Sequence, residues 1–346
     1  MGFNVKHLNK YFRWVKQTGK NYLANKRVSG KFAKLCLDLD VALLRQRGDD
    51  IDKKAKKKHD YLLGYLRALC PETLEKYGNL PEPEGLNEPQ SDIKVWSMWW
   101  QGEENADKLF RMCIDSARRE TGCPVTVLDK DSYKQYFNIP AFILDKYLAG
   151  NINPAHICDY MVVSILAEQG GFFTGATVWC SQSIPERILR APFYVCKAET
   201  ESTYLMSRSR WVGYLLGGKK EFPLFGFARD FLNEYWSKMD YVVDYLLLDY
   251  IFELAYQTVP CVKRIIDENP DNNLLRNELI GRLGDEYDEE QFKRFTEGDT
   301  MFYKLSWKFG SKDTETVGGK LTNYGYMLDK YLQSKRGKDY GKIQND

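Results

Sequence analysis

Aspartates within two helical stretches are the side chains best suited to acid or base chemistry. Asp159 lies in the helical pattern of residues 155–168, and Asp244 and Asp249 lie in a later one. Five residues turn an α-helix through about 500°, so Asp244 and Asp249 would point about 140° apart. We therefore expect them not to form one carboxylate pair, and we expect Asp244 to be a surface or cap residue.

Lys304 and Lys308 are spaced so that both could serve one anionic ligand. Side chains four positions apart lie on the same side of a helix or of an extended strand. Two ammonium groups placed in this way could meet the oxygens of a diphosphate. The alternative is a pair of solvated surface lysines.

Asp129 and Asp131 form a D-x-D pattern, which resembles a motif for divalent metals. The pattern directly follows a predicted strand at residues 125–128. Aspartates in that position commonly cap turns and helix starts by accepting bonds from backbone N–H groups. We therefore predict turn and cap roles for both.

A strand that ends in Trp100-Gln101-Gly102 could bind a nucleotide. Backbone amides and a ring edge at the carboxyl edge of a parallel sheet can face a ligand. A buried aromatic strand end closed by a glycine turn is the alternative. No G-x-G-x-x-G follows this strand, which disfavours a dinucleotide-dependent oxidoreductase.

The spacing of the cysteines and histidines does not favour a metal site or a nucleophilic catalytic group. The eight cysteines include no C-x-x-C pair, which argues against a zinc site or a disulfide framework and favours reduced, buried thiols. The three histidines, His7, His59 and His156, are far apart in the sequence. Histidine-based metal sites and Ser/His/Asp catalysis are therefore disfavoured.

Strands and helices alternate through the middle of the chain and would position these residues. The apolar patterns predict strands at 93–100, 125–128, 177–180 and 193–196, helices at 106–119, 143–148 and 155–168, a strand-like segment at 204–207, and a helical pattern from Trp211 to Tyr256. Such alternation predicts a doubly wound α/β sheet flanked by helices.

Basic residues are concentrated near the N-terminus. Residues 1–58 contain 16 Lys and Arg against 5 Asp and Glu, a net charge of +11, whereas the remainder carries −9. Residues 3–20 mix apolar and basic side chains at helical spacing, and a second basic cluster covers residues 53–58. The pattern is typical of a segment that binds an anionic membrane surface, with a solvated helix packed on the rest of the protein as the alternative. No nucleic acid is expected as a partner.

Three regions are predicted along the chain. Residues 1–90 form a basic helical extension that ends in a Pro-rich linker at 71–92, residues 91–335 form the main α/β domain, and residues 336–346 form a polar tail. No apolar run approaches the roughly 20 residues that a membrane-spanning helix needs, and no secretory signal is present. We expect a cytoplasmic protein that can attach to the inner membrane face.

Short motifs follow one another in a fixed order between residues 90 and 310. They are Trp99-Trp100-Gln101-Gly102 with Glu104-Asn105-Ala106, the stretch 127–131, Asn138-Ile139-Pro140, Pro154-Ala155-His156 with Asp159, Gly170-Gly171, Trp211, Asp244-Tyr245, Asp249-Tyr250, and Lys304-Leu305 with Trp307-Lys308. This collinear series resembles the capsular polysaccharide synthesis glycosyltransferases, and an ordered series is more specific than any single motif. The N-terminal extension lies outside the resemblance.

The resemblance implies an A-type glycosyltransferase fold, a Rossmann-like mixed sheet flanked by helices. It also implies transfer of a sugar from a nucleotide-sugar donor to a saccharide or lipid-linked acceptor in surface polysaccharide synthesis. Asp249 would face the acceptor, as a base or an orienting group. The donor-binding residues would be Trp100, Gln101, Gly102, Asp159, Gly170, Gly171, Thr174, Gly175, Thr177, Lys304 and Lys308.

The chain departs from the family's metal motif. Relatives carry G-G-x-x-x-D, whose aspartate helps hold Mg²⁺ or Mn²⁺ on the donor diphosphate, and an arginine three residues after the helix aspartate. Here Gly175 stands in the place of that metal aspartate, and Val162 stands in the place of the arginine. No metal ligand is therefore assigned. Three explanations stay open: a metal-independent reaction in which Lys304 and Lys308 supply the cations, a different donor, or a non-catalytic relative that binds or scaffolds polysaccharide assembly.

Overall fold

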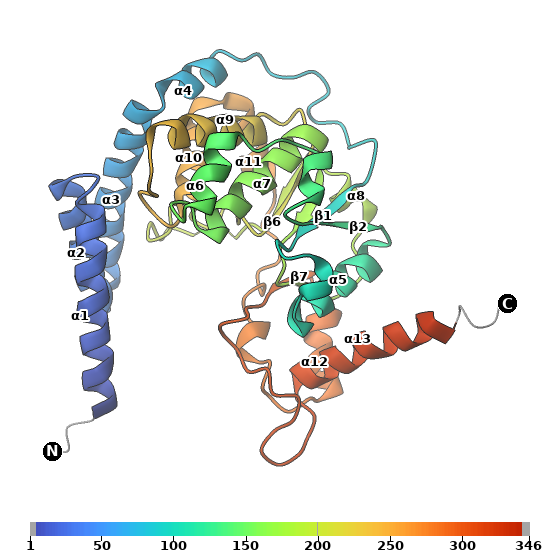
Figure 1. The fold of residues 1–346 in the computed structure, drawn as a ribbon. Helices are drawn as coiled ribbons and strands as arrows, with labels where there is room; N and C mark the ends of the chain where they lie inside the picture. Colours follow the sequence, from blue (N-terminus) through green and yellow to red (C-terminus); the bar gives the residue numbers. More distant parts are fainter. Residues whose placement is uncertain (1–4, 199, 341–346) are drawn as a thin grey trace.

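The computed structural model describes residues 5–198 and 200–340, with side chains described within residues 14–331. Figure 1 shows an arch, in which a central body carries the main sheet, α1 to α3 form an arm on one side, and the C-terminal segment projects on the other. The helices are α1 (Val5–Asn25), α2 (Gly30–Arg45), α3 (Gly48–Leu69), α4 (Pro71–Gly78), α5 (Lys108–Thr121), α6 (Ala141–Leu148), α7 (Pro154–Gln169), α8 (Glu186–Leu189), α9 (Pro223–Lys238), α10 (Leu247–Thr258), α11 (Pro260–Glu268), α12 (Glu289–Thr296) and α13 (Asn323–Tyr340). The strands are β1 (Val95–Met98), β2 (Val125–Leu128), β3 (Gly171–Thr174), β4 (Val178–Cys180), β5 (Phe193–Val195), β6 (Leu215–Gly218) and β7 (Phe302–Lys304).

A five-stranded mixed sheet with the order β2-β1-β3-β6-β5 forms the centre of the body. β1 is parallel to β2 and to β3, whereas β6 runs antiparallel to β3 and β5 antiparallel to β6. The carboxyl ends of β1, β2 and β3 therefore meet at one edge, together with the amino end of β6. The sheet, its helices and the N-terminal helical extension confirm the predicted α/β class.

Alternate side chains of the strands build two hydrophobic layers. Trp96 and Phe173 belong to one cluster with residues of α7, α9 and α10. Their strand neighbours Val95 and Phe172 belong to a second cluster with residues of α5, β4 and β7. The central strands are thus covered on both faces, as expected for parallel strands in an α/β protein.

A smaller layer lies beneath α5 and completes the body. β4 and β7 pair antiparallel, with Val178 opposite Lys304. Trp179 and Tyr303, at the centre of this pairing, join residues of α5, α12 and α13 in a third cluster. The pairing matters for function because it sets Lys304 beside the loop that follows β3.

The N-terminal extension shares the core of the body. Phe32 of α2 and Leu62 of α3 are fully buried in the cluster that contains α7, α9 and α10. His59 of α3 is also buried, with its Nδ1 atom 2.7 Å from the Tyr250 hydroxyl and its Nε2 atom 3.1 Å from the Tyr204 carbonyl oxygen. α3 is therefore a structural part of the body.

The linker prediction was wrong in part. α4 occupies the first part of the predicted linker and packs on α9, where Thr73 donates hydrogen bonds to Glu234 and Tyr77 donates one to Asp230. Only the stretch from Asn79 to β1 is irregular. The predicted tail at 336–346 overlaps α13, which continues to Tyr340, and residues 341–346 lie outside the described residues.

Two further element predictions were also wrong. Residues 204–207 form a turn and not a strand, and the helical pattern predicted from Trp211 to Tyr256 is interrupted by β6 and by residues 239–246. β6 is buried along its whole length, so its residues do not alternate between apolar and polar. A short apolar run of this kind cannot be assigned to strand or helix by periodicity.

Candidate functional site

Several chain segments converge at the carboxyl edge of the central sheet. The loop after β3 is fixed to the segment before β6, because the Gly175 amide donates a hydrogen bond of 2.8 Å to the Tyr214 carbonyl. The β4–β7 pairing adds Lys304 to this loop. α7 and α10 contribute Asp159 and Asp249. The edge therefore unites residues from five elements that are distant in sequence.

Asp159 and Asp249 lie close enough for the charge of one to affect the ionisation of the other. Both side chains are partly buried. Burial, assisted by the charge of Asp249, raises the pKa of Asp159 to about 7. Burial also raises the pKa of Asp249 to about 6, against a hydrogen bond from Trp211 that lowers it. Carboxyl groups that titrate near neutral pH in such a setting are suited to proton transfer.

Trp211 fixes the orientation of Asp249. Its indole Nε1 donates a hydrogen bond of 3.0 Å to Asp249 Oδ1. The indole is itself fully buried, and the Arg210 guanidinium lies 4.4 Å from its centroid and 4.5 Å from that of Tyr256. Arg210 is held by an ion pair to Glu253. This chain of contacts stabilises one position of the Asp249 carboxylate.

Lys304 is the cation of the site. Its ammonium donates to the Thr177 hydroxyl and, at 3.2 Å, to the Leu305 carbonyl, and it lies 5.3 Å from the centroid of the Tyr214 ring. The charges of Lys304 and Asp159 both affect the ionisation of Cys158 on α7, so this thiol lies within electrostatic reach of each. The ionisation of Lys304 itself responds to Cys113 and Cys158, whereas that of Asp159 responds to Asp249. Burial lowers the pKa of Lys304, so an anionic ligand would favour its charged form.

Two buried hydroxyl groups at this edge have no hydrogen-bond partner among the described residues. They belong to Ser97 of β1 and Thr174 of β3. These residues come one position after the registered pair of Trp96 and Phe173, so they lie side by side on neighbouring strands. Buried polar groups are usually paired, so both hydroxyls are candidates for contact with a ligand or an ordered water. Sequence analysis missed Ser97, although a polar residue within an apolar strand was the available signal.

Trp100, Gln101 and Gly102 follow β1 at the same edge. The Trp100 ring stacks on Tyr133 at a centroid distance of 6.3 Å, and Gln101 is exposed. Gly102 has a φ of +88°, a conformation that L side chains rarely adopt. The segment is therefore a glycine turn that leaves the Gln101 side chain free of the core.

Gly170 and Gly171 were predicted to contact the donor, but the structure places them elsewhere. They lie at the amino end of β3, which is the opposite edge of the sheet from Gly175. Both have positive φ values, of +64° and +105°, and a Cβ atom on Gly171 would lie 2.5 Å from the Lys94 carbonyl oxygen. The backbone conformation and these close contacts are enough to require glycine at both positions, with no ligand involved. We therefore do not include Gly170 and Gly171 in the site.

Other predicted residues have mixed outcomes. Asp129 Oδ1 accepts hydrogen bonds from the backbone amides of Asp131 and Ser132, which confirms the predicted turn role of Asp129. Asp244 precedes α10 and accepts a hydrogen bond from the Leu246 amide, which confirms the expected cap role, although the assumption of one helix through both aspartates was wrong. Asp244 is not on the surface, because its side chain is mostly buried in an ion pair of 2.6 Å with Lys58.

Lys308 does not join the buried group around Lys304. It is exposed, and its ammonium lies 4.8 Å from the centroid of Trp307, which is 63% exposed. The spacing had suggested that the two lysines lie on one surface, but the structure separates them. The reason is that β7 ends at Lys304 and the chain then leaves the strand as an irregular loop.

The family model described as capsular polysaccharide synthesis protein matches residues 46–324, which is most of the chain. The chain belongs to this family. The match begins just before α3, so the prediction that the whole extension lies outside the resemblance was wrong. No curated protein and no solved structure matches the chain.

In this capsular polysaccharide synthesis protein the residues at the expected metal position do not fit a divalent ion. A Cβ atom on Gly175 would lie 2.9 Å from the Tyr214 carbonyl oxygen, so even a short side chain is crowded there. The Lys304 ammonium, which donates to Thr177 in the same loop, would repel a cation. Within the described residues, no three His, Cys, Asp or Glu side chains are grouped as a metal site.

The membrane prediction is tested only in one respect. Among the described residues of this capsular polysaccharide synthesis protein, none of the helices has the length and apolar character to cross a bilayer.

Proposed function

We propose that this protein transfers a sugar from a nucleotide-sugar donor to a saccharide or lipid-linked acceptor in capsule synthesis, without a metal held by the protein. The observation that carries the proposal is the coupled pair of Asp159 and Asp249, with Lys304 reaching Cys158, the neighbour of Asp159 on α7, from the loop at the carboxyl edge of the sheet. Open α/β sheets bind ligands at that edge. Family membership supports a role in capsule synthesis.

Lys304 would stabilise the leaving diphosphate. Its ammonium is partly buried, and a charge in a desolvated site interacts more strongly with an anion than it would in water. The hydroxyls of Thr174, at the end of β3, and of Thr177, in the loop that follows, would donate to the remaining oxygens.

The remaining donor contacts follow from the same geometry. Trp100, Gln101 and Gly102 would face the nucleotide, because they leave the end of β1 beside this loop. Asp159 would accept hydrogen bonds from hydroxyls of the donor sugar. The partly buried Asp159 carboxylate contributes little to core packing. We therefore assign it to binding of the donor sugar and not to stability of the fold.

Asp249 would accept the proton of the attacking acceptor hydroxyl. The acceptor oxygen forms a bond to the anomeric carbon while the bond from that carbon to the diphosphate breaks, and the diphosphate leaves with the electron pair. A carboxyl group with a pKa of about 6 is ionised at neutral pH and is a stronger base than an ordinary aspartate. The hydrogen bond from Trp211 leaves Asp249 Oδ2 available for this proton.

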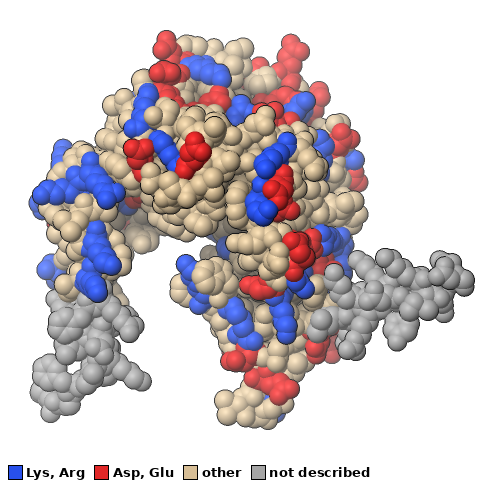
Figure 2. All heavy atoms as spheres, in the orientation of Figure 1, with Lys and Arg blue, Asp and Glu red and all other residues tan. Residues whose placement is uncertain are grey.

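The N-terminal arm would hold the protein near a membrane that carries the acceptor. The exposed basic residues of its described part are Lys16, Lys20, Lys26, Arg27, Lys31, Lys34, Arg45, Arg47, Lys53, Lys56 and Lys57. Figure 2 shows basic side chains gathered on this arm. Each such charge near an anionic surface contributes about 1 kcal/mol of attraction. Lys58, predicted as part of the patch, points inward to Asp244.

A screen of nucleotide diphosphate sugars tests the donor assignment. We expect at least one to raise the Tm of the full chain and to release its nucleoside diphosphate during incubation, since a ligand stabilises the folded state that binds it. Asp159→Ala should fold normally and lose this shift. A set of donors that neither bind nor turn over would favour the non-catalytic alternative.

A further inference from the structure

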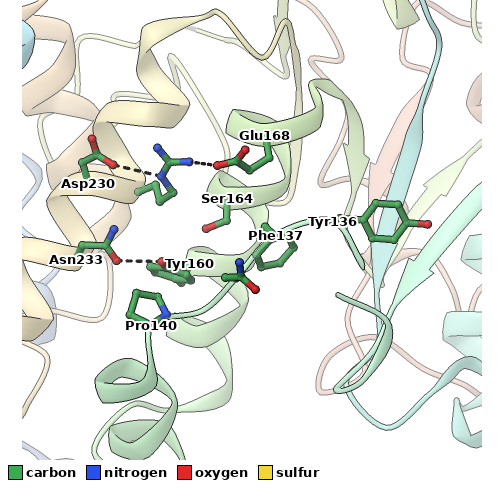
Figure 3. A pocket seen from close by; sticks show the side chains of 10 residues that line it. Tyr136, Phe137, Pro140, Tyr160, Ser164, Glu168, Asp230 and Asn233 are labelled. Atoms are coloured by element: carbon green, nitrogen blue, oxygen red, sulfur yellow. Dashed lines mark hydrogen bonds and ion pairs between the residues drawn. The ribbon is translucent and has the colours of Figure 1, made fainter. Parts of the chain in front are cut away.

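A hollow of about 430 Å³ lies away from the proposed transfer site, between α7, α9 and the segment before α6. Figure 3 shows it from close by. On α7 it is lined by Tyr160, Ser164 and Glu168, which are four residues apart and so form one stripe about 12 Å long. Asp159 lies about 100° around the helix from Tyr160 and belongs to a different face.

The polar groups of this hollow are held in place by one another. Arg229 Nη1 lies 2.5 Å from Glu168 Oε1, and Arg229 Nε lies 3.2 Å from Asp230 Oδ1. Tyr160 donates a hydrogen bond of 2.9 Å to Asn233 Oδ1. Each of these contacts leaves further donor and acceptor positions on the same groups. The walls are thus preorganised before any ligand arrives.

One buried hydroxyl points into the hollow. Ser164 is fully buried, and its hydroxyl lies near that of Tyr160 but forms no hydrogen bond of normal geometry with a described residue. Figure 3 shows it directed toward the side of the hollow on which Tyr160 and Asn233 lie. Phe137 and Pro140 add apolar surface to the lining. Asn138, of the Asn138-Ile139-Pro140 motif, is exposed at the same site.

The charges of the lining exclude a phosphate ligand. Among the residues that line the hollow, the basic one is Arg229. Its guanidinium is already paired with two carboxylates, those of Glu168 and Asp230. The lining therefore offers no unpaired cation, and the second oxygen of Asp230 is paired with Lys76 from outside the hollow. Amide, hydroxyl, carboxylate and apolar ring surfaces at close range suit a neutral ligand with many hydroxyl groups.

We propose that this hollow is a second saccharide site, which binds a neutral sugar unit of the acceptor away from the unit that receives the new sugar. The saccharide class rests on the proposed function. Binding at a remote unit would position a growing chain at Asp249 and would lower the KM for long acceptors. The Asn138-Ile139-Pro140 motif, which the transfer site does not use, would serve this second site.

The test compares binding of neutral hexose and N-acetylhexosamine oligosaccharides by saturation-transfer NMR. The variants are Asn138→Ala, which removes an exposed amide, and Ser164→Leu, which fills the hollow. Asn151→Ala, an exposed asparagine outside the site, is the matched control. We expect binding to the wild type, to Asp249→Asn and to the control, with at least a tenfold loss in both hollow variants.

The outcomes separate this inference from the proposed function. If oligosaccharides bind but the hollow variants bind them equally well, or if only acidic oligosaccharides or phosphate bind, the inference is wrong while transfer at Asp249 can stand. If the hollow variants lose binding and raise the acceptor KM without changing donor hydrolysis, it is supported. Binding at the hollow by a protein without any transferase activity would refute the proposed function alone. No binding of any oligosaccharide to the wild type would refute the inference.

Discussion

At the scale of single residues, the raised pKa values of the two carboxyl groups predict how stability changes with pH. The pKa of Asp159 is about 7 in the folded protein, above its ordinary value. This raised pKa stabilises the folded state below about pH 4, and the contribution is lost as pH rises through 7. Asp159→Asn should therefore be more stable than the wild type at pH 8, by about 1–3 kcal/mol, with a smaller difference at pH 4. Urea unfolding at both pH values measures this, with the exposed Asp131→Asn as control. Equal stability at pH 8 would refute the burial argument.

The hydrogen bond from Trp211 predicts a shift in the pH profile of activity. If Asp249 must be ionised to accept a proton, kcat/KM should rise with pH through about 6. The Trp211 indole favours the ionised form, so Trp211→Phe should raise that apparent pKa and lower activity most at acidic pH. Steady-state rates between pH 5 and 8 measure both effects. An equal loss at every pH would indicate a structural role for Trp211 alone.

Sequence reasoning identified Asp159, Asp249, Thr174, Thr177 and Lys304, but it could not place them together. Their proximity depends on strand order and on the β4–β7 pairing, which join segments far apart in the chain. It also misjudged Gly170 and Gly171, because a glycine that approaches a backbone carbonyl has the same sequence signal as one that approaches a ligand.

At the scale of elements, α3 is predicted to support α10 through His59. Its ring is buried between the Tyr250 hydroxyl and the Tyr204 carbonyl. His59→Ala leaves both groups without their partner and creates a cavity, so we expect a loss of about 2–4 kcal/mol. Lys56→Ala, on an exposed face of the same helix, should cost under about 0.5 kcal/mol. Similar stability of the two variants in urea would mean that α3 does not hold α10.

Most elements between residues 106 and 196 were predictable, because amphipathic helices and apolar strands alternate there with clear turn signals. α4 was missed because a helix of eight residues shows only two turns of periodicity, Thr73 and Tyr77 being its buried positions. β6 was missed because a fully buried strand shows no alternation. The sequence therefore specifies long amphipathic elements better than short or wholly buried ones.

At the scale of the whole molecule, the basic arm predicts salt-dependent membrane binding. The full chain should sediment with vesicles of anionic lipid at low ionic strength and be released as salt is raised, because screening shortens the reach of surface charges. Replacing Lys16, Lys20, Lys31 and Lys34 with glutamate should abolish sedimentation, since all four are exposed on the arm. Changing Lys312 and Lys320 on the opposite side of the arch should have little effect. Binding that is absent, or that resists salt, would refute the electrostatic account.

The central claim is that the carboxyl edge transfers sugar with Lys304 in place of a protein-bound metal. The most direct measurement is release of nucleoside diphosphate from the stabilising donor, in the presence of acceptor, with EDTA or with added Mn²⁺. We predict equal rates in both conditions, a loss of more than tenfold in Lys304→Met, and a similar loss in Asp249→Asn. Activity that requires Mn²⁺, with Mn²⁺ binding abolished by Asp159→Asn, would contradict the account by placing a metal at the carboxylates.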